Sequence, residues 1–290
     1  MEHIVVGFDG SEASVAALEW TAQRAQHVPS HVTLTSVGEF FESERELRSV
    51  SHEGADMCRR LAPSATIDTK VLRGWMPDTL LESSKAADLL VVRSHLHAPV
   101  RSMLKGWIPL RVSVRSAVPS CVVPAGWRQR TGPVVVGYDD DGSSEAALRF
   151  AASEAARTKQ ELLIVHAWPE KMFHSGTRAE HEAVTHRAAL AVSRTYPGLP
   201  LEQVMMADDP ALVLEALAQK AALVVIGSHR HGALAGGLLG TVAWFVIGQM
   251  TAPLCVVPPD SLAPLEPSVQ RGQSVATPAG CESDPSSSRR

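Results

Sequence analysis

The stretch Leu89–Pro124, LLVVRSHLHAPVRSMLKGWIPLRVSVRSAVPSCVVP, occurs a second time as Leu223–Pro258, LVVIGSHRHGALAGGLLGTVAWFVIGQMTAPLCVVP. The two stretches align without a gap, 134 residues apart, and 13 of their 36 positions are identical. The beginnings of the two halves match as well, because Ile4–Asp9 (IVVGFD) aligns with Val134–Asp139 (VVVGYD). The chain therefore contains one module twice, and differences between the copies indicate which chemistry each has kept.

Each copy alternates short β-branched runs with helical patterns, which is typical of βαβ units and a parallel sheet. Five strands and four helices per copy predict an α/β fold: two tandem, doubly wound, Rossmann-like domains, each with a five-stranded parallel sheet. We expect domains at 1–127 and 132–258, and a tail at 259–290 whose Pro, Ser, Gly and Gln content predicts disorder. The strands are expected at His3–Phe8, His31–Val37, Thr66–Leu72, Asp88–Val92, Ser120–Val123, Val134–Tyr138, Glu161–Ala167, Leu201–Met206, Leu223–Ile226 and Leu254–Val257.

Local signals also predict where helices begin. Ser14 and Ser144 precede Ala-rich patterns and are predicted to cap the first helix of each copy. Pro77 and Pro210 stand where a first-turn proline would begin the third helix of each copy.

The composition limits the possible functions. The chain has 290 residues, of which 45% are hydrophobic and 20% charged, as in ordinary globular proteins. A net charge of −4 argues against nucleic-acid binding. Cys121 and Cys255 lie in equivalent apolar runs and are expected to be buried free thiols, which indicates a reducing compartment. A strand is expected within three residues of the amino terminus, which leaves no room for a signal peptide. Together these features predict a cytoplasmic location. The uncharged stretch Ala233–Gly248 is too short and too rich in glycine for a membrane helix, so no membrane association is expected.

The second copy carries a glycine-rich loop, GSHRHGALAGGLLGT from Gly227 to Thr241, after a buried strand and before a predicted helix. Glycines allow backbone amides to converge, and a helix amino terminus favours anions. Neither GxxxxGK[ST] nor GxGxxG is present, which argues against a P-loop NTPase or a dinucleotide fold. From the residues alone, the loop is either an anion site or a connection that needs glycine only for tight packing.

Residues 1–258 resemble a tandem universal stress protein, of the adenine nucleotide α-hydrolase-like superfamily, in having DGSxxS after the first strand and a glycine loop closing on Gly-Thr after the fourth. ATP-binding members of this family carry G-x2-G-x9-G-(S/T). Gly227, Gly240 and Thr241 match this motif, whereas Arg230 replaces the second glycine. The resemblance implies ATP, with Mg²⁺, in the second copy, near Asp139 at the adenosine end. From the residues, His229 or His231 is a further candidate to contact a phosphate, and Val242, next to Thr241, is counted among the expected ATP-binding residues. Arg230 either obstructs the turn or reaches the phosphates as a fixed cation.

The first copy has lost most of this pattern. Gly227 and Thr241 are replaced there by Arg93 and Trp107, and only Asp9 and Gly106 remain of the motif. We therefore expect the first copy to be a degenerate partner domain. Its cluster of Arg93, Arg101 and Lys105 either holds some other anion or forms a solvated basic face.

The sequence predicts neither a catalytic nucleophile nor a metal site built from protein ligands. No Ser/His/Asp or Cys/His arrangement is evident, and the His-x-His pairs at 95–97 and 229–231 lack further ligands at metal-binding spacing. The acidic run 139–141 either helps to hold Mg²⁺ on a phosphate or forms an ordinary turn.

Three functions remain open. The resemblance implies a stress-response protein that binds ATP and acts through its conformation or an unknown regulatory protein partner, hydrolysing ATP slowly at most. The second possibility is a nucleotide-free scaffold whose last strands, Ser120–Val123 and Leu254–Val257, pair the two repeats or two chains of a homodimer. The third, an enzyme of the adenine nucleotide α-hydrolase fold, would need an SGGxDS-like turn where this chain has DGSEAS.

Overall fold

The computed structural model describes residues 1–38, 43–94, 103–169, 177–228, 250–259 and 261. Residues 1–127 are called repeat 1 below and residues 132–258 repeat 2. The glycine loop from position 229 onward, the stretch 233–248 and nearly all of the tail lie outside the described residues. Among the described helices, none is both long enough and apolar enough to cross a membrane.

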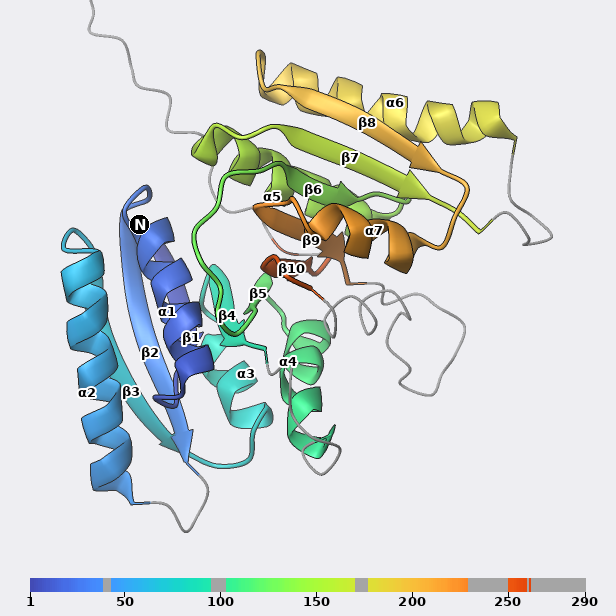
Figure 1. Cartoon of the computed structure of the whole chain (residues 1–290). Coiled ribbons are helices and arrows are strands. Elements are labelled where there is room, and N and C mark those ends of the chain that lie inside the picture. Colours follow the sequence, from blue (N-terminus) through green and yellow to red (C-terminus); the bar gives the residue numbers. More distant parts are fainter. Residues whose placement is uncertain (39–42, 95–102, 170–176, 229–249, 260, 262–290) are drawn as a thin grey trace, which may run out of the picture.

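Strands and helices alternate along both repeats (Figure 1). All ten predicted strands are confirmed, and each end lies within one residue of its expected position. The elements of repeat 1 are β1 (Glu2–Gly7), α1 (Glu12–Ala25), β2 (Ser30–Gly38), α2 (Glu44–Leu61), β3 (Thr66–Arg73), α3 (Asp78–Ser84), β4 (Leu89–Arg93), α4 (Met103–Arg115) and β5 (Ser120–Val123). Those of repeat 2 are β6 (Val134–Gly137), α5 (Gly142–Thr158), β7 (Leu162–Ala167), α6 (Arg178–Thr195), β8 (Leu201–Met206), α7 (Pro210–Ala218), β9 (Leu223–Gly227) and β10 (Leu254–Val257).

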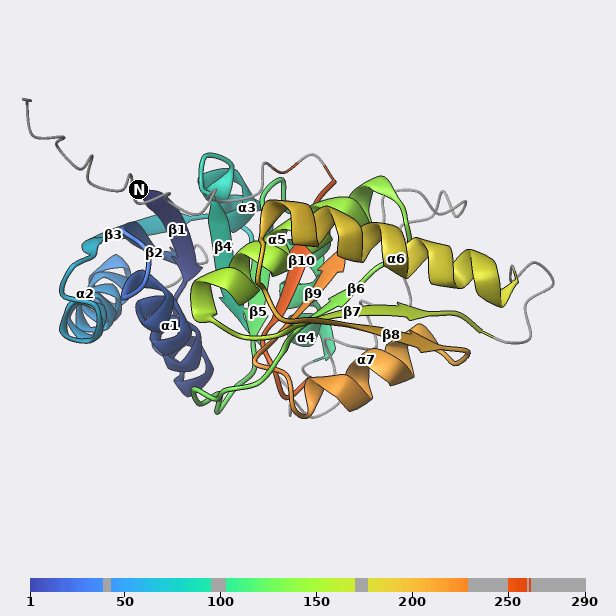
Figure 2. The same ribbon diagram turned by 90° about the horizontal axis from the view of Figure 1, so that it is seen from above.

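The ten strands form one continuous sheet in the order β3-β2-β1-β4-β5-β10-β9-β6-β7-β8. Within each repeat neighbouring strands are parallel, as predicted, whereas β5 and β10 pair antiparallel at the centre. The last strands of the two repeats therefore pair with each other within the chain. Figures 1 and 2 show the sheet twisting from repeat 1 through this central pair into repeat 2.

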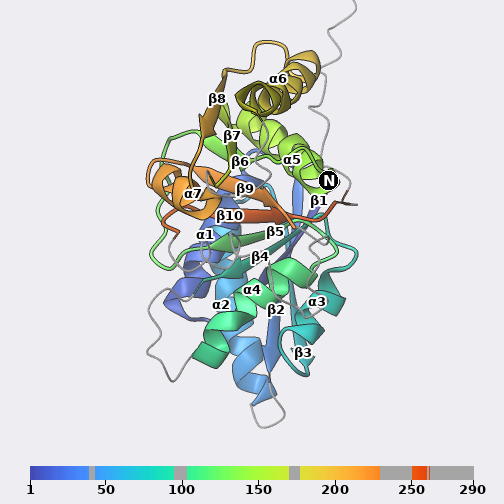
Figure 3. The same cartoon turned by 90° about the vertical axis from the view of Figure 1, so that its right-hand side faces the viewer.

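Helices cover both faces of the sheet, as in a doubly wound fold (Figure 3). Side chains alternate along a strand, so Ile4 and Val6 of β1 enter one apolar core and Val5 enters the other. The first core also contains the apolar residues of α1, α2, α5 and α6, and the second those of α3, α4 and α7. The sheet is thus buried on both faces, as a parallel sheet requires.

The centre of the sheet is a pseudo-two-fold axis relating the repeats. Cys121 and Cys255, which are equivalent in the repeat alignment, lie directly opposite each other in the β5–β10 ladder. Both are fully buried free thiols, which confirms the expectation. Burial raises the pKa of Cys121 well above its usual value, with a further contribution from Cys255.

A second pair of equivalent positions, Arg24 of α1 and Glu154 of α5, faces across the same axis. Arg24 Nη1 donates to Glu154 Oε1 at 2.5 Å, while its Nε and Nη2 donate to Glu2 at 2.9 and 2.7 Å. All three residues are buried. If two identical modules paired symmetrically, a residue at the two-fold axis would face the same residue of the other module. Two identical charges at that position would repel each other. Duplication within one chain has allowed the position to become arginine in one repeat and glutamate in the other.

The helix caps differ from the predicted ones by three residues. The N-caps are Ser11 for α1 and Asp141 for α5, so the assignment of Ser14 and Ser144 as caps was wrong. Ser144 instead completes a capping box, in which its hydroxyl accepts from the Asp141 backbone amide. Pro210 is the first residue of α7, as predicted, whereas Pro77 directly precedes α3.

Candidate functional site

The candidate site of repeat 2 lies where β6 and β9 end. Asp139 follows β6, and Gly227 is the last residue of β9, which is the strand paired with β6. The sheet thus brings together two of the predicted site residues, because parallel neighbours end at the same edge. The other predicted residues of this site, His229, Arg230, Gly240, Thr241 and Val242, lie outside the described residues.

Gly227 has a packing reason to be glycine. A Cβ atom there would lie 2.5 Å from Ser143 Oγ and 2.6 Å from the Ser143 carbonyl carbon. The end of β9 therefore approaches the first turn of α5 more closely than any side chain would allow. Ser143 and Ser144 donate their backbone N–H groups to Asp141 Oδ1 at 2.9 and 2.7 Å, so the cap already uses these donors of the helix.

The three aspartates at 139–141 have three different roles. Asp141 caps α5, and Asp140 forms an ion pair with Arg187 of α6. Asp140 also lies near the Tyr138 hydroxyl, which donates to Glu145 at 2.5 Å; burial and these two carboxylates raise the pKa of Tyr138 far above its usual value. Asp139 remains, with its side chain 67% exposed. The run is thus mainly a structural turn that presents one carboxylate at the sheet edge.

A pair of histidines lies beside this carboxylate. His166 Nδ1 is 2.9 Å from the Tyr138 carbonyl oxygen and 3.7 Å from Asp139 Oδ1. Because a carbonyl only accepts, Nδ1 of His166 carries the proton, and its Nε2 accepts from His181 Nδ1 at 2.7 Å when both rings are neutral. His181 Nε2 is then a buried acceptor with no hydrogen-bond partner among the described residues. The His181 ring stacks on Trp168, with ring centroids 3.7 Å apart.

These aromatic residues were not among the predicted site residues. At the 130-residue offset of the strand alignment, His166 and His181 correspond to Ser36 and Ser51 of repeat 1. The two serine hydroxyls are also hydrogen-bonded, at 2.7 Å. Repeat 2 has therefore replaced a small polar pair by two imidazoles next to Trp168. Comparing the halves beyond the glycine loop would have revealed this difference.

At the equivalent edge of repeat 1 the aspartate is held in an ion pair. Arg93, which occupies the position of Gly227, donates from Nη2 to Asp9 Oδ2 at 2.6 Å. Ser11 donates its backbone N–H and its hydroxyl to the other carboxylate oxygen. Burial alone would raise the pKa of Asp9, but the hydrogen bonds from Ser11 and the charge of Arg93 together lower it. Gly106, the other residue retained from the motif, lies within α4.

The two edges therefore differ in what their carboxylates can bind. Asp9 is held by the Arg93 guanidinium, whereas Asp139 faces a glycine that has no side chain to reach it. Of the predicted basic cluster, Arg93 is thus committed to Asp9, and the side chains of Arg101 and Lys105 lie outside the description. Within the described part of the chain, no three His, Cys, Asp or Glu residues are arranged to hold a metal ion.

Comparison with known proteins agrees with this architecture. The sequence model of the Universal stress protein family matches residues 1–124 and 131–258. The universal stress protein Rv1996 of Mycobacterium tuberculosis is 28% identical over 307 residues, which cover 90% of this chain and 97% of that protein. Rv2005c of the same organism is 27% identical over 282 residues, covering 87% of this chain and 96% of its own length.

A solved universal stress protein from Archaeoglobus fulgidus has the same fold. It superimposes with a TM-score of 0.69 at 17% identity, covering 89% of this chain and 96% of its own. The family model matches both repeats, and the strands of both repeats form the ten-stranded sheet. The chain belongs to the universal stress protein family, as a tandem member with two family domains.

Proposed function

We propose that this protein binds ATP, with Mg²⁺, at the carboxyl ends of β6 and β9, and that repeat 1 binds no nucleotide. Membership of the universal stress protein family supports a role in the stress response. The observation that carries the nucleotide proposal is the contrast between the two strand edges. Asp9 is 49% exposed and ion-paired with Arg93, whereas Asp139 is 67% exposed and lies opposite Gly227, which has no side chain to pair with it.

In the proposed complex Asp139 accepts hydrogen bonds from the ribose hydroxyls. Trp168 follows the neighbouring strand β7, and His181 lies on α6. The flat face of Trp168 and His181 Nε2, an acceptor with no partner among the described residues, suit a base with an amino group. The phosphates and Mg²⁺ are assigned to the loop that begins at Gly227 and includes His229, Arg230, Gly240, Thr241 and Val242. This assignment remains a prediction from the sequence.

The protein would act in the cytoplasm through nucleotide-dependent conformation or the choice of a protein partner, rather than through catalysis. Two described acidic residues near the site are already engaged, Asp140 by Arg187 and Asp141 by the helix cap. Asp139 is thus the member of this run that neither pairs with an arginine nor caps the helix among the described residues, and we expect ATP hydrolysis to be slow at most.

Two observations favour the alternative, a nucleotide-free scaffold. The central β5–β10 ladder and the buried Arg24–Glu154 contact hold the repeats together without any ligand. In addition, Gly227 is explained by its contact with Ser143 whether or not a phosphate binds.

Isothermal titration calorimetry with ATP and Mg²⁺ separates these functions. We expect saturable binding by the full chain and a loss of about tenfold or more in affinity for Asp139→Ala, since charged hydrogen bonds are lost. Asp9→Ala is the matched control at the equivalent position of repeat 1, and it should bind as the unchanged protein does. Absence of binding at millimolar ATP, or equal effects of the two substitutions, would favour the scaffold.

A second comparison addresses the loop itself. The double substitution Gly240→Arg with Thr241→Trp places bulky side chains where the family motif has glycine and a hydroxyl. We expect it to abolish ATP binding. Full retention of binding would show that this loop does not hold the phosphates.

A further inference from the structure

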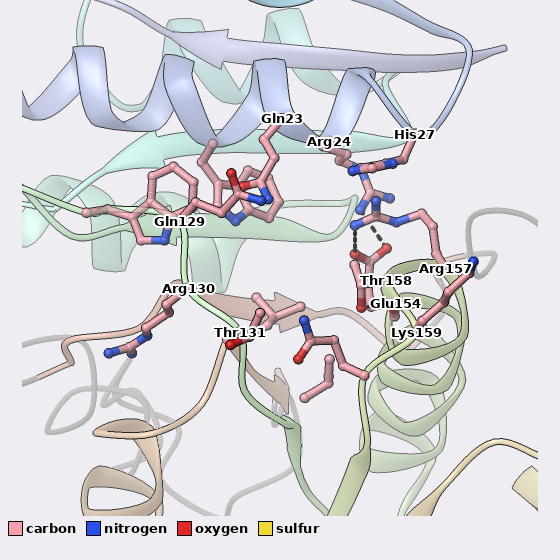
Figure 4. Close-up of a pocket in the computed structure, with 16 residues that line it drawn as sticks. Gln23, Arg24, His27, Gln129, Arg130, Thr131, Glu154, Arg157, Thr158 and Lys159 are labelled. Atoms are coloured by element: carbon pink, nitrogen blue, oxygen red, sulfur yellow. Dashed lines mark hydrogen bonds and ion pairs between the residues drawn. The ribbon is translucent and has the colours of Figure 1, made fainter.

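A cavity of about 320 Å³ lies between the two repeats, away from the nucleotide edge (Figure 4). Its walls come from the last turns of α1 and α5, from the linker between the repeats, and from Val134 and Leu223, which begin β6 and β9. Asp139 and Gly227 stand at the other ends of these two strands. The cavity is therefore distinct from the candidate nucleotide site.

Positive charge predominates around this cavity. Its lining contains four cationic side chains, Arg24, Arg130, Arg157 and Lys159. Glu154 is the only acidic residue among the described residues of the lining. Glu2, which is not part of the lining, also forms an ion pair with Arg24. Two positive charges remain in excess. Figure 4 shows Arg24 and Arg157 converging on Glu154 on one side of the cavity, and Arg130 on the opposite side.

Several N–H donors of these guanidinium groups have no acceptor within the described ranges of the chain. Arg157 Nη2 donates to Glu154 Oε2 at 2.6 Å, but its Nε and Nη1 are buried and have no hydrogen-bond partner among the described residues. Arg130 donates from its two terminal nitrogens to carbonyls at the end of α7, yet its Nε is also buried with no partner in the part of the chain that the structure describes. Burial lowers the pKa of Arg130. Buried donors without acceptors are costly, and an entering anion would satisfy them with small side-chain shifts.

The remaining walls suit a ring. Trp20 and Trp127 line the cavity with their indole groups almost wholly buried in the protein, at 7% and 8% exposure. Indole faces pack against flat rings, whereas Gln23, Gln129 and Gln160 offer amides to polar substituents. A volume of about 320 Å³ is at the lower end of the range for small-molecule sites.

We propose that this inter-repeat cavity is a binding site for a small phosphate monoester that carries a flat ring. The phosphate dianion matches the two excess positive charges and accepts from Arg157 and Lys159, while the ring packs against the tryptophans. Arginine binds phosphate through paired N–H donors, which makes Arg157 the main contact. Because the cavity contacts both repeats, occupancy would stabilise their arrangement.

Phenyl phosphate is a suitable probe for calorimetry on the full chain, with inorganic phosphate as the ringless comparison. We expect one phenyl phosphate per chain and weaker binding of inorganic phosphate. Arg157→Gln should weaken the binding of phenyl phosphate about tenfold. Lys159→Asn should weaken the binding of phenyl phosphate several-fold. Lys159 is exposed and has a φ of 56°, a backbone conformation that asparagine tolerates, so this variant should fold. Arg194→Gln, an exposed position in the last turn of α6, is the charge-matched control and should change nothing.

The outcomes decide the proposal independently of ATP. Asp139→Ala should leave phenyl phosphate binding intact, and loss of binding in that variant would assign the probe to the nucleotide edge and overturn the cavity proposal. No saturable binding up to about 10 mM would also overturn it. If Arg157→Gln does not melt cooperatively, Lys159→Asn decides, and an affinity equal to that of the unchanged protein would contradict the proposal.

Discussion

Replacing Arg24 by methionine removes the cation that joins the two repeats at their pseudo-two-fold axis. The Arg24 side chain is 2% exposed and contacts two carboxylates, those of Glu2 and Glu154, whose side chains are 0% and 3% exposed. Without it, both carboxylates would remain buried, although Glu154 would keep its 2.6 Å contact with Arg157. Methionine roughly preserves the volume, so the main change is the loss of charge and of three hydrogen bonds.

Removing one partner of a buried ion pair costs about 3–5 kcal/mol, because the other charge is left uncompensated. For a chain of this size that loss corresponds to a fall in the melting temperature of roughly 10 °C. Urea denaturation followed by circular dichroism at neutral pH measures the change in the free energy of unfolding. Arg149→Met on the exposed side of α5 is the control, and it should change stability by about 0.5 kcal/mol or less.

The triple variant Glu2→Gln, Arg24→Met, Glu154→Gln tests the reasoning further. It removes the charges of both carboxylates that Arg24 contacts, so most of the lost stability should return. A loss below about 1 kcal/mol for Arg24→Met alone would refute the conclusion that this ion network stabilises the pairing of the repeats.

Two further predictions concern single residues. Burial raises the pKa of Glu154, but Arg24 and Arg157 lower it more, to about 2 from a usual 4.5. The carboxylate therefore stabilises the fold above about pH 4.5, and this contribution of about 3 kcal/mol is lost as the pH falls towards 2. In Glu154→Gln, the free energy of unfolding measured by urea denaturation should change less with pH over that range. Gly227→Ala should cost about 1–3 kcal/mol in thermal or urea unfolding, since its Cβ would overlap the first turn of α5. Gly142→Ala, which has open space around the added carbon, should not destabilise, and equal effects at the two glycines would contradict the overlap.

The ends of the strands could be predicted to within one residue because the same residue pattern occurs twice in the chain. A β-branched run that recurs at a fixed offset, such as Leu89–Val92 and Leu223–Ile226, is rarely mistaken for a helix. The helix caps were less certain, because several Ser and Asp residues near Ser11 and Asp141 could each serve as the cap. Only the geometry of the first turn selects one of them.

Pairing between the repeats could not be derived from local patterns. Ser120–Val123 and Leu254–Val257 are apolar runs that fit equally well against each other or against another chain, and the sequence left both open. A signal was nevertheless present, because Arg24 and Glu154 occupy equivalent positions and carry opposite charges. Opposite charges at a self-facing position favour pairing of one repeat with the other.

At the candidate site the sequence identified Asp139 and Gly227 but missed what surrounds them. The loss of glycine at Arg93 was visible, whereas its ion pair with Asp9 depends on two strand ends that meet only in the folded sheet. The partners of His166 lie on a different strand and helix, so spacing alone could not bring them together.

The number of ATP molecules bound per chain tests the central claim most directly. Equilibrium dialysis of the full chain with labelled ATP and Mg²⁺ at saturating nucleotide measures that number. The exposed Asp139 opposite Gly227 in repeat 2 and the Arg93–Asp9 ion pair in repeat 1 predict a stoichiometry of one. Two ATP molecules per chain would show that the Arg93–Asp9 pair does not close repeat 1, and none would show that the exposed Asp139 edge is not a nucleotide site.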